Sequence, residues 1–476
     1  MASYGVTNIP SIVTDAFNEA VGKNSSVTKI TTTNFVDCGH VLSDFDLMDG
    51  WYGSLCKRII KVLFFAKTYN AETRRILRDE STFGGFVEKL YTIAPDAVNN
   101  PVWQYAPDSS TRKITQVSPY GLEDTLTVKS VIFGKEGTWS YEFIQPMVQL
   151  KKAWQTPSEM VGFIDSQFIP VRNKIEAAKE SVIAAAVNTS MAKSLSVGNA
   201  INLLGEYVAA TSDATVTSLD TFLISKPALK YANRVMAKYI KLMSKLSTKF
   251  NAEGYETFTP REDLLLDVVT DYAQASAFYL ESDTYHKELV ELPGYTEVPF
   301  WQTPGDGVAA TAADCTEIYI ENTDINNGDP VVQSGIVAFA RDIENTAAYF
   351  GDEYEWSVPN VRQRISNHGF QYNKGYAVDN FTNALVFYIA AVGTITKITS
   401  DAHISSITCS PDYTEPGKDI TVTVTAGSGY HAKKVTVSAN SKTIDITSTV
   451  DDDGKYHYTP NDTSNITIAA TSEADA

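Results

Sequence analysis

Cysteine is scarce in this sequence, which excludes a protein held together by a disulfide framework. A secreted chain of this length that relied on disulfides would carry dense, patterned cysteines. We therefore expect a reducing compartment. The 476 residues contain four scattered cysteines: Cys38, Cys56, Cys315 and Cys409.

Long hydrophobic runs are also missing. The most extended one, near Ala384 to Val392, is about half of the ~20 residues that a membrane helix needs. The segment MASYGVTNIPSIVTDAF at the start has no basic region followed by an apolar stretch, so no secretory signal is predicted. We expect a soluble protein without a membrane partner.

Positive charge is in short supply. The sequence has 39 lysines and arginines against 57 aspartates and glutamates, which gives a formal net charge of −18. A nucleic-acid reader offers many cationic contacts to phosphate, so this balance argues against that class of protein. It is compatible with a container, because a shell that holds DNA by enclosure gains from weak binding.

No motif for catalysis or metal binding stands out. The segment from Cys38 to His40 lacks a second pair of ligands, and the segment from Asp324 to Asp329 departs from the calcium-loop pattern. The acidic segment from Asp451 to Gly454 is more typical of a hairpin tip. The six histidines share no local constellation with a nucleophile. We predict no catalytic residue, no cofactor and no metal, hence no enzyme.

Alternating residues dominate the segment before residue 150. Leu126 to Phe133 and the sequence WSYEFI flank a glycine-bounded turn, which predicts a β-hairpin. Phe86 to Ile93 also alternates, so we expect a long two-stranded excursion from the body. Such a ribbon is marginal alone in water, and its aromatic face needs another surface, on this chain or on a neighbour. The residues on that face are our candidates for self-assembly: Trp139, Tyr141 and Phe143.

The middle of the chain mixes helices and strands without a βαβ rhythm, which indicates an α+β fold. Apolar residues at steps of three and four predict helices over residues 171–187 and 225–246, and residues 271–283 also resemble a helix. Apolar runs predict buried strands over residues 59–65, 263–269, 337–342 and 384–392.

The composition changes sharply near Asp401. Beyond it, short alternating segments such as DITVTVTA and KKVTVSAN are separated by turns rich in Gly, Pro and Asp. This pattern predicts a separate all-β sandwich of Ig-like type over residues 402–476.

Five segments carry a resemblance to a known family: LCKRIIKV, GGFVEKLY, VKSVIFGKEGTWSYEFIQ, DLLLDVVTDYA and VDNFTNALVFYIAA. Together with the order of elements, they resemble the HK-97-like major capsid fold of tailed bacteriophages. More narrowly, the chain looks like the major capsid proteins of phi-29-like podophages. The resemblance spans residues 43–400, and the Ig-like module looks like a different sequence type from the one usual in that group.

The resemblance implies the domain organisation of that fold, with a C-terminal Ig-like domain added. The expected parts are an N-terminal arm (1–42), an arm-to-E-loop segment (43–85), an E-loop (86–150), a P-domain with a spine helix (151–222), an A-domain (223–359), P-domain return strands (360–400) and the Ig-like domain (402–476).

The resemblance also implies function and partners. Copies of the chain would self-assemble as pentamers and hexamers into an icosahedral or prolate head shell that encloses double-stranded DNA without sequence-specific binding. Assembly would take place in the host cytoplasm with a scaffolding protein and a portal protein, and the product would be the virion capsid. The Ig-like domain would project outward for host or surface adhesion and would be dispensable for shell formation.

Two other functions stay open at this point. The Ig-like module also fits a phage tail fibre or a surface adhesin, which would need a secretion signal or an anchor if it were cellular. A carbohydrate-active enzyme with an accessory sandwich would need two carboxylates facing each other across a cleft. The sequence offers no such pair.

Overall fold

The computed structural model of this chain describes residues 14–19, 38, 51, 54, 77–78, 87–93, 127–133, 136–146, 178–211, 213, 215–281, 294–302, 315–321, 325, 329–360, 362–399, 401–440 and 442–475. The expected N-terminal arm and the strand over residues 59–65 lie almost entirely outside these residues. Within the described ranges, no helix is long and apolar enough to cross a membrane.

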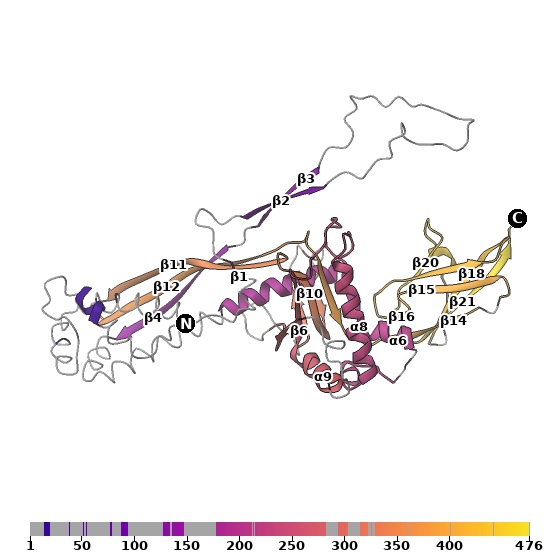
Figure 1. Ribbon diagram of the computed structural model, residues 1–476, viewed down its shortest axis with the longest axis horizontal. Coiled ribbons are helices and arrows are strands. Elements are labelled where there is room, and N and C mark those ends of the chain that lie inside the picture. The colour runs from indigo at the N-terminus through magenta and orange to yellow at the C-terminus, as the bar shows by residue number, and fades with distance from the viewer. Residues whose placement is uncertain are drawn as a thin grey trace, which may run out of the picture.

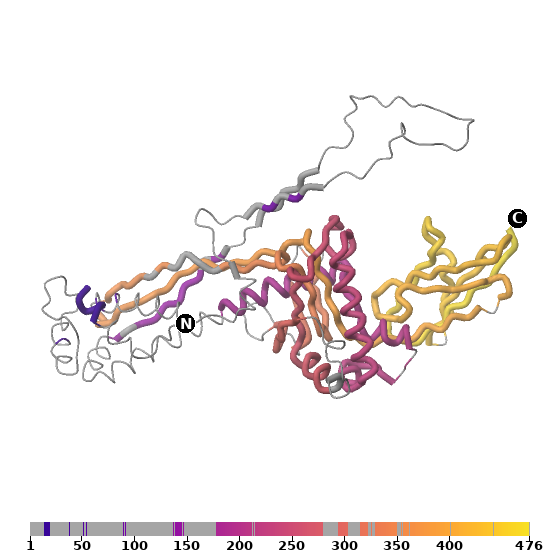
Figure 2. The backbone as a smooth tube through the Cα atoms, viewed as in Figure 1, coloured from indigo at the N-terminus to yellow at the C-terminus, as the bar shows by residue number. Residues whose placement is uncertain are grey.

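The molecule is elongated, with a long β-structured arm at one end and a β-sandwich at the other (Figure 1). Between them lies a body of helices packed on a sheet, and the smooth trace in Figure 2 shows the same succession. A narrow two-stranded ribbon leaves this row near the junction of the arm and the body.

The body contains a five-stranded mixed sheet in the order β5-β13-β10-β6-β7. Every residue of its second strand is buried, because the sheet is covered on both faces, as the uninterrupted apolar run in the sequence predicts. The strands expected over residues 263–269 and 337–342 are confirmed here, and the one expected over residues 384–392 exists but ends at Tyr388. The strands are β5 (Ala200–Asn202), β6 (Leu264–Val269), β7 (Thr296–Val298), β10 (Ile336–Asp342) and β13 (Ala384–Tyr388).

Helices cover both faces of this sheet. On one face, Leu229, Met236 and Ile240 of a long helix pack with Leu385 and Phe387 of β13. The helices on that face are α6 (Leu203–Thr211), α7 (Leu219–Leu223), α8 (Lys226–Met243) and α9 (Thr270–Glu281). The expected helices over residues 225–246 and 271–283 therefore exist with slightly different ends.

The helix over residues 178–196 covers the opposite face of the sheet. Its Val187 and Met191 pack with Phe339 of β10 and Val386 of β13. The sequence predicts this helix only to residue 187. It continues because buried side chains recur through the next two turns.

The arm is a four-stranded sheet in the order β1-β11-β12-β4. Two long antiparallel strands form its spine, and the chain turns between them at Arg364, whose φ is +51°. The strands are β1 (Leu77–Arg78), β4 (Glu136–Pro146), β11 (Thr346–Asn360) and β12 (Ile365–Val378). β4 lies antiparallel to β12, from Glu136 opposite Gly375 to Pro146 opposite Ile365.

The ribbon pairs β2 (Val87–Ile93) with β3 (Thr127–Phe133) in antiparallel register. The two strands are confirmed, but the predicted hairpin of residues 126–133 with the WSYEFI strand is wrong. β4 pairs with β12, so β3 and β4, although close in the sequence, belong to different sheets. Alternation identifies a strand and its faces, but it does not identify the partner strand. A small hairpin, β8 (Ile318–Ile320) with β9 (Val331–Gln333), lies elsewhere in the chain.

The C-terminal part packs a five-stranded sheet, β16-β14-β21-β18-β19, against a three-stranded sheet, β15-β17-β20. Ile420, Val422, Val435 and Val437 lie in its core and alternate with outward residues. The strands are β14 (Gly393–Ile398), β15 (Ile404–Ser410), β16 (Tyr413–Thr414), β17 (Ile420–Ala426), β18 (Tyr430–Ala439), β19 (Lys442–Asp445), β20 (Tyr456–Tyr458) and β21 (Ile466–Ala474), with a 3₁₀ turn η5 (Thr447–Thr449).

The sandwich begins earlier than the sequence predicts. β14 pairs in parallel with β21, from Ile395 opposite Ile466 to Ile398 opposite Ala469. This strand was expected to belong to the preceding part of the chain, because the change in composition comes only after it. The described sandwich therefore starts at residue 393 instead of residue 402.

Candidate assembly surfaces

The three predicted assembly residues lie on one face of β4, as the alternation indicates. The register with β12 places Trp139 opposite Tyr372, Tyr141 opposite Phe370, and Phe143 opposite His368. The Phe143 ring centroid lies 5.8 Å from that of Phe370 and 5.6 Å from that of His368. Much of this face is therefore covered by the same chain.

Trp139 differs from the other two, because 52% of its surface is exposed. The Lys374 ammonium lies 3.7 Å from the centroid of the Trp139 ring, in a cation–π contact. Tyr141 stacks on Tyr372 with centroids 5.9 Å apart. Trp139 is thus the predicted candidate that remains most open to a second molecule.

The opposite face of the same sheet carries exposed apolar residues that the sequence interpretation missed. Val358 of β11 and Ile144 of β4 both lie opposite Asn367 of the central strand, so they belong to one row across the sheet. Tyr354 lies on the same face, and the exposed fractions of Ile144, Val358 and Tyr354 are 61%, 54% and 63%. We call these three residues the open face of the arm.

Trp356 lies between Tyr354 and Val358 on the same face of β11. It stands opposite Gly369, and a Cβ atom on that glycine would overlap the Trp356 indole. Glycine at this position therefore lets a large ring lie flat across the central strand. The signal in the sequence was the alternation of Tyr354, Trp356 and Val358 along one face of their strand.

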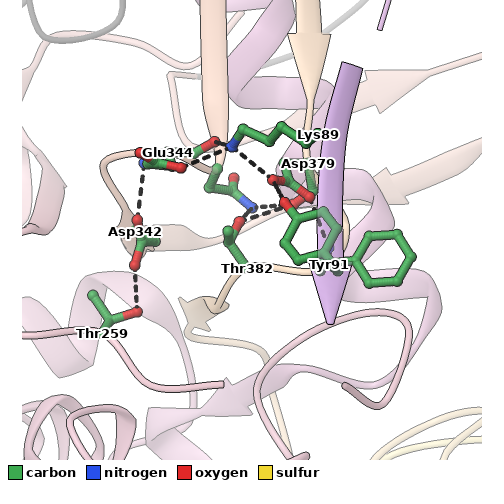
Figure 3. A network of polar contacts seen from close by, with 9 residues as sticks. Lys89, Tyr91, Thr259, Asp342, Glu344, Asp379 and Thr382 are labelled. Carbon is green, nitrogen blue, oxygen red and sulfur yellow. Dashed lines mark hydrogen bonds and ion pairs between the residues drawn. The ribbon is translucent and has the colours of Figure 1, made fainter. Parts of the chain in front are cut away.

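A second group of side chains connects the ribbon to the body (Figure 3). The Lys89 ammonium of β2 lies 2.9 Å from a carboxylate oxygen of Asp379 and 2.9 Å from one of Glu344. Tyr91, two residues further on the same strand face, donates its hydroxyl proton to the Asp379 carboxylate. We call this group the ribbon anchor.

Aromatic contacts complete the ribbon anchor. The Tyr91 ring stacks on Phe381 with centroids 4.8 Å apart and meets Tyr255 edge-on at 5.6 Å. Burial, and then the nearby Asp379 carboxylate, raise the pKa of the Tyr91 hydroxyl, which keeps it a proton donor.

The body side of the anchor is held in place by its own hydrogen bonds. The Asp379 side chain is buried, and its second oxygen accepts from the Phe381 backbone N–H at 3.0 Å. The Asn345 amide donates to the Asp379 backbone carbonyl at 3.0 Å. Asp342 accepts from the Glu344 backbone N–H and from Thr259. The turn that receives the ribbon is therefore pre-organised (Figure 3).

A third contact joins the sandwich to the body. Glu415, just after β16, accepts hydrogen bonds from the Tyr388 hydroxyl of β13 at 2.8 Å and from the Asn202 amide of β5 at 3.1 Å. The Lys418 ammonium lies 3.2 Å from the same carboxylate. The Tyr413 ring lies against Gly205 of α6, where a Cβ atom would overlap the ring. We call this group the sandwich mount.

Of the three segments considered for metal binding, only residues 451–454 lie fully within the described part of the chain. The segment from Asp451 to Gly454 forms a turn in which the Asp451 N–H donates to the Lys455 carbonyl at 2.8 Å. In the portion of the chain that the structure describes, no cluster of three or more His, Cys, Asp or Glu side chains is arranged to hold a metal. Most of the segments 38–40 and 324–329 lies outside the described residues.

Comparison with known proteins gives one family match. The family model described as "Phi29-like phage major capsid protein" matches residues 13–388 of this chain. The match ends at the last residue of β13, so the whole sandwich lies outside it. No curated protein matches the sequence.

Solved phage structures also resemble this chain at low sequence identity. The capsid structure of Staphylococcus phage Andhra is 13% identical, covers 66% of this chain and 83% of its own, and gives a TM-score of 0.39. The capsid structure of the cyanophage P-SCSP1u is 10% identical, covers 69% of this chain and 93% of its own, and gives a TM-score of 0.38.

Proposed function

This chain belongs to the Phi29-like phage major capsid protein family, and we propose that its copies assemble as pentamers and hexamers into an icosahedral or prolate shell around double-stranded DNA. As a member of that family it is a structural protein of the virion head and not an enzyme. The family match favours this function over a tail fibre or an adhesin.

We assign the parts of the HK-97-like fold to the described elements. The β2–β3 ribbon is the base of the E-loop, and the helix over residues 178–196 is the spine helix of the P-domain. Helices α8 and α9 with strands β6, β7 and β10 lie in the A-domain, whereas β5 and β13 of the same sheet come from the P-domain. The element order supports this assignment, since the long strand β12 returns beside β4 as a P-domain strand would.

The open face of the arm is the observation that carries the assembly proposal. Three large side chains with much apolar surface lie more than half exposed on one sheet face, which is unfavourable in water. Full burial of a large apolar side chain is worth about 1.5–3 kcal/mol, so covering the exposed part of each would contribute roughly half of that. A neighbouring copy in a shell would cover them. Repetition around the shell would then add many modest contacts into a stable assembly.

Our predicted assembly residues remain Trp139, Tyr141 and Phe143, but we propose different roles for them. Trp139 is the exposed member and can contact a neighbour directly. Tyr141 and Phe143 support it by fixing β4 on β12 through their ring contacts. Phe143→Asp would therefore disturb the fold of the arm as well as assembly, and Trp139→Asp is the cleaner variant.

We propose that the sandwich is the Ig-like domain and that it faces outward for host or surface adhesion. Two observations support this: it lies outside the family match, and it stands at the opposite end of the molecule from the arm (Figure 1). A scaffolding protein and a portal protein complete assembly in the host cytoplasm.

Electron microscopy of the purified full chain, alone and with its scaffolding protein, tests the proposed function. We expect closed shells of uniform size with five-fold and six-fold clusters. A chain that remains monomeric at high concentration in both samples contradicts the proposal. The Trp139→Asp variant should give fewer or no shells while its circular dichroism spectrum matches that of the wild type.

A further inference from the structure

The loop between α8 and β6 places two exposed apolar side chains next to each other. Ser247 and Thr257 exchange both backbone hydrogen bonds, at 3.0 and 3.1 Å, so the loop folds back on itself as two antiparallel limbs. This register puts Leu246 opposite Phe258, on the face that points away from the side chains of Ser247 and Thr257. Leu246 is 59% exposed and Phe258 is 52% exposed, whereas Ser247 and Thr257 are half-buried. We call Leu246 and Phe258 the loop pair.

Hydrogen bonds hold this loop in one conformation. The Thr259 N–H donates to the Met243 carbonyl at 2.9 Å, and the Thr259 hydroxyl donates to the Asp342 carboxylate at 2.7 Å. Near the tip of the loop, the buried Asn251 side chain accepts from the Tyr255 N–H at 2.7 Å. A local rearrangement that buried the loop pair would break these bonds. The exposed apolar surface is therefore fixed in place and pre-organised for contact with another molecule.

Charges of opposite sign lie on the two limbs of the loop. The first limb, residues 241–249, carries three lysines and no acid, whereas the second limb, residues 253–262, carries three glutamates and one arginine. All of these side chains are exposed. In the part of the chain that the structure describes, other exposed residues form ion pairs, such as Lys433 with Glu473, but none of these seven does. The lysines and glutamates of the limbs are Lys241, Lys245, Lys249, Glu253, Glu256 and Glu262.

This arrangement of charge is complementary to itself. A two-fold axis that runs between the limbs and parallel to them turns a second copy over, so that its first limb lies on the second limb of the other copy. Leu246 of each copy would then meet Phe258 of the other, and lysines would face glutamates on both sides of the axis. A partner with a uniformly acidic or basic surface would match only one limb. The charge pattern therefore favours a second copy of this chain.

We propose that the loop pair and its charged limbs form a two-fold contact between two copies of this chain. This inference rests on the proposed function, since a shell of five-fold and six-fold clusters brings copies from neighbouring clusters together in pairs. The contact is separate from the open face of the arm, because the loop does not belong to the arm sheet. Two apolar side chains per copy bury too little area for a tight dimer. Unassembled chains therefore associate weakly, and repetition in the shell adds the contacts together.

The test reverses the charge of one limb at a time in the full-length chain. The first-limb variant carries Lys245→Glu and Lys249→Glu, and the second-limb variant carries Glu256→Lys and Glu262→Lys. A combined variant carries all four substitutions, so that the two limbs exchange their charges.

The control variant carries Lys230→Glu and Lys442→Glu. It makes the same change in net charge as the first-limb variant at exposed lysines outside the loop. Circular dichroism of every variant should match the wild type, because each substituted side chain is exposed.

Self-association is measured by sedimentation equilibrium at low salt, without scaffolding protein. The wild type and the control should show a weak monomer–dimer equilibrium that weakens further as salt is added. Each limb variant should lower the association constant at least about tenfold, because like charges would face each other. The combined variant should regain association, and so should an equal mixture of the two limb variants. Recovery in the mixture requires two molecules, so a change within one chain cannot produce it.

No association of the wild type, equal association of the wild type and both limb variants, an equal loss in the control, or no recovery in the mixture would each overturn the proposal. Electron microscopy of the same variants separates another occupant. Limb variants that associate like the wild type but form no shells with scaffolding protein would assign the loop to the scaffolding protein and would also overturn the proposal. A wild-type chain that associates in pairs but forms no shells would contradict the proposed function instead and would leave the loop contact standing.

Discussion

The Glu415 carboxylate of the sandwich accepts a hydrogen bond from the Tyr388 hydroxyl of the body sheet at 2.8 Å. Both side chains are buried, and the Asn202 amide donates to the same carboxylate. Burial, and then the charge of Glu415, raise the pKa of Tyr388, so the phenol remains a donor at all physiological pH values. The sandwich is therefore joined to the body by a specific polar contact.

Replacing Glu415 with alanine should loosen this joint. The Tyr388 hydroxyl and the Asn202 amide would lose their acceptor in a buried place, which costs about 2–3 kcal/mol. We expect a lower thermal unfolding midpoint and faster amide exchange in β13 and β16. Glu473→Ala, which removes an exposed pair with Lys433, is the control and should change the midpoint little. An identical change in the unfolding midpoint for both variants would argue against a stabilising role of the sandwich mount.

Gly205→Ala should move the sandwich away from the body because of a steric clash. A methyl group on Gly205 would overlap the Tyr413 ring, so the two parts must move apart even though alanine favours the helix. Small-angle scattering should show a less compact molecule with intact secondary structure. Adding Tyr413→Leu should restore part of the wild-type profile. A Gly205→Ala profile that matches the wild type would contradict this prediction.

Asp379→Asn should weaken the ribbon anchor. The amide cannot balance the Lys89 ammonium, and it accepts more weakly from Tyr91, so a loss on the order of 2 kcal/mol is expected. Amide exchange across β2 should accelerate while that of β12 stays unchanged. Glu344→Gln is the matched control, because the Glu344 side chain is 55% exposed and its pair with Lys89 is worth less.

Ile144→Asp should block shell formation without unfolding the arm. The side chain is 61% exposed, so the charge remains hydrated in the monomer but would be buried under a neighbour. Sedimentation should show monomers or small oligomers in place of shells. The control is Val450→Asp on the sandwich, which is 49% exposed and should leave assembly intact. Shells formed normally by Ile144→Asp would remove the open face from the assembly proposal.

His457 should make the stability of the sandwich depend on pH. Its Nδ1 lies 2.6 Å from an Asp419 oxygen and its Nε2 lies 3.2 Å from an Asp451 oxygen. These hydrogen bonds raise the pKa of His457, with Asp419 the larger cause. The stabilisation is therefore complete below the unfolded-state value of about 6.5 and is lost as pH rises through the higher folded value.

The measurement for His457 is the thermal midpoint of the sandwich at several pH values between about 6 and 9. His457→Gln should flatten the profile over this range. His431→Gln, which removes another exposed histidine–aspartate pair, should keep the wild-type profile. A His457→Gln profile that falls as steeply as that of the wild type would contradict the assignment.

The body of this protein could be predicted from the sequence because its signals are local. The run from Ala384 to Tyr388 is apolar at every position, since both faces of the sheet are covered, and the period of α8 is set by a single buried side. These patterns identify an element without knowledge of its neighbours. The α+β class and the three buried strands followed from them.

Pairing and exposure could not be predicted in the same way. The sequence around the Gly134–Gly137 turn is compatible with a hairpin, and only tertiary structure pairs β4 with β12. For the same reason, the sequence allows Phe143 to be covered by this chain or by a neighbour, and only the structure shows that Phe370 and His368 of its own chain lie against it. Ile144 lies on the face of β4 whose other residues are mostly polar. Whether it is exposed depends on which face of the arm sheet the rest of the chain covers, and the sequence does not give that.

The contacts of the ribbon anchor and the sandwich mount could not be predicted from the sequence. Lys89 and Asp379 are 290 residues apart, and neither belongs to a recognisable motif.

The sandwich mount has a practical consequence for replacing the sandwich with another domain. Tyr388 is both the final residue of the family match and a hydrogen-bond donor to Glu415, so the sandwich is held by residues of the part of the chain that the family model covers. A foreign domain grafted there would have to bring its own acceptor for Tyr388 and Asn202. With that acceptor, the grafted domain would be held in one orientation on the body, and without it the domain would be connected to the body only by the polypeptide chain.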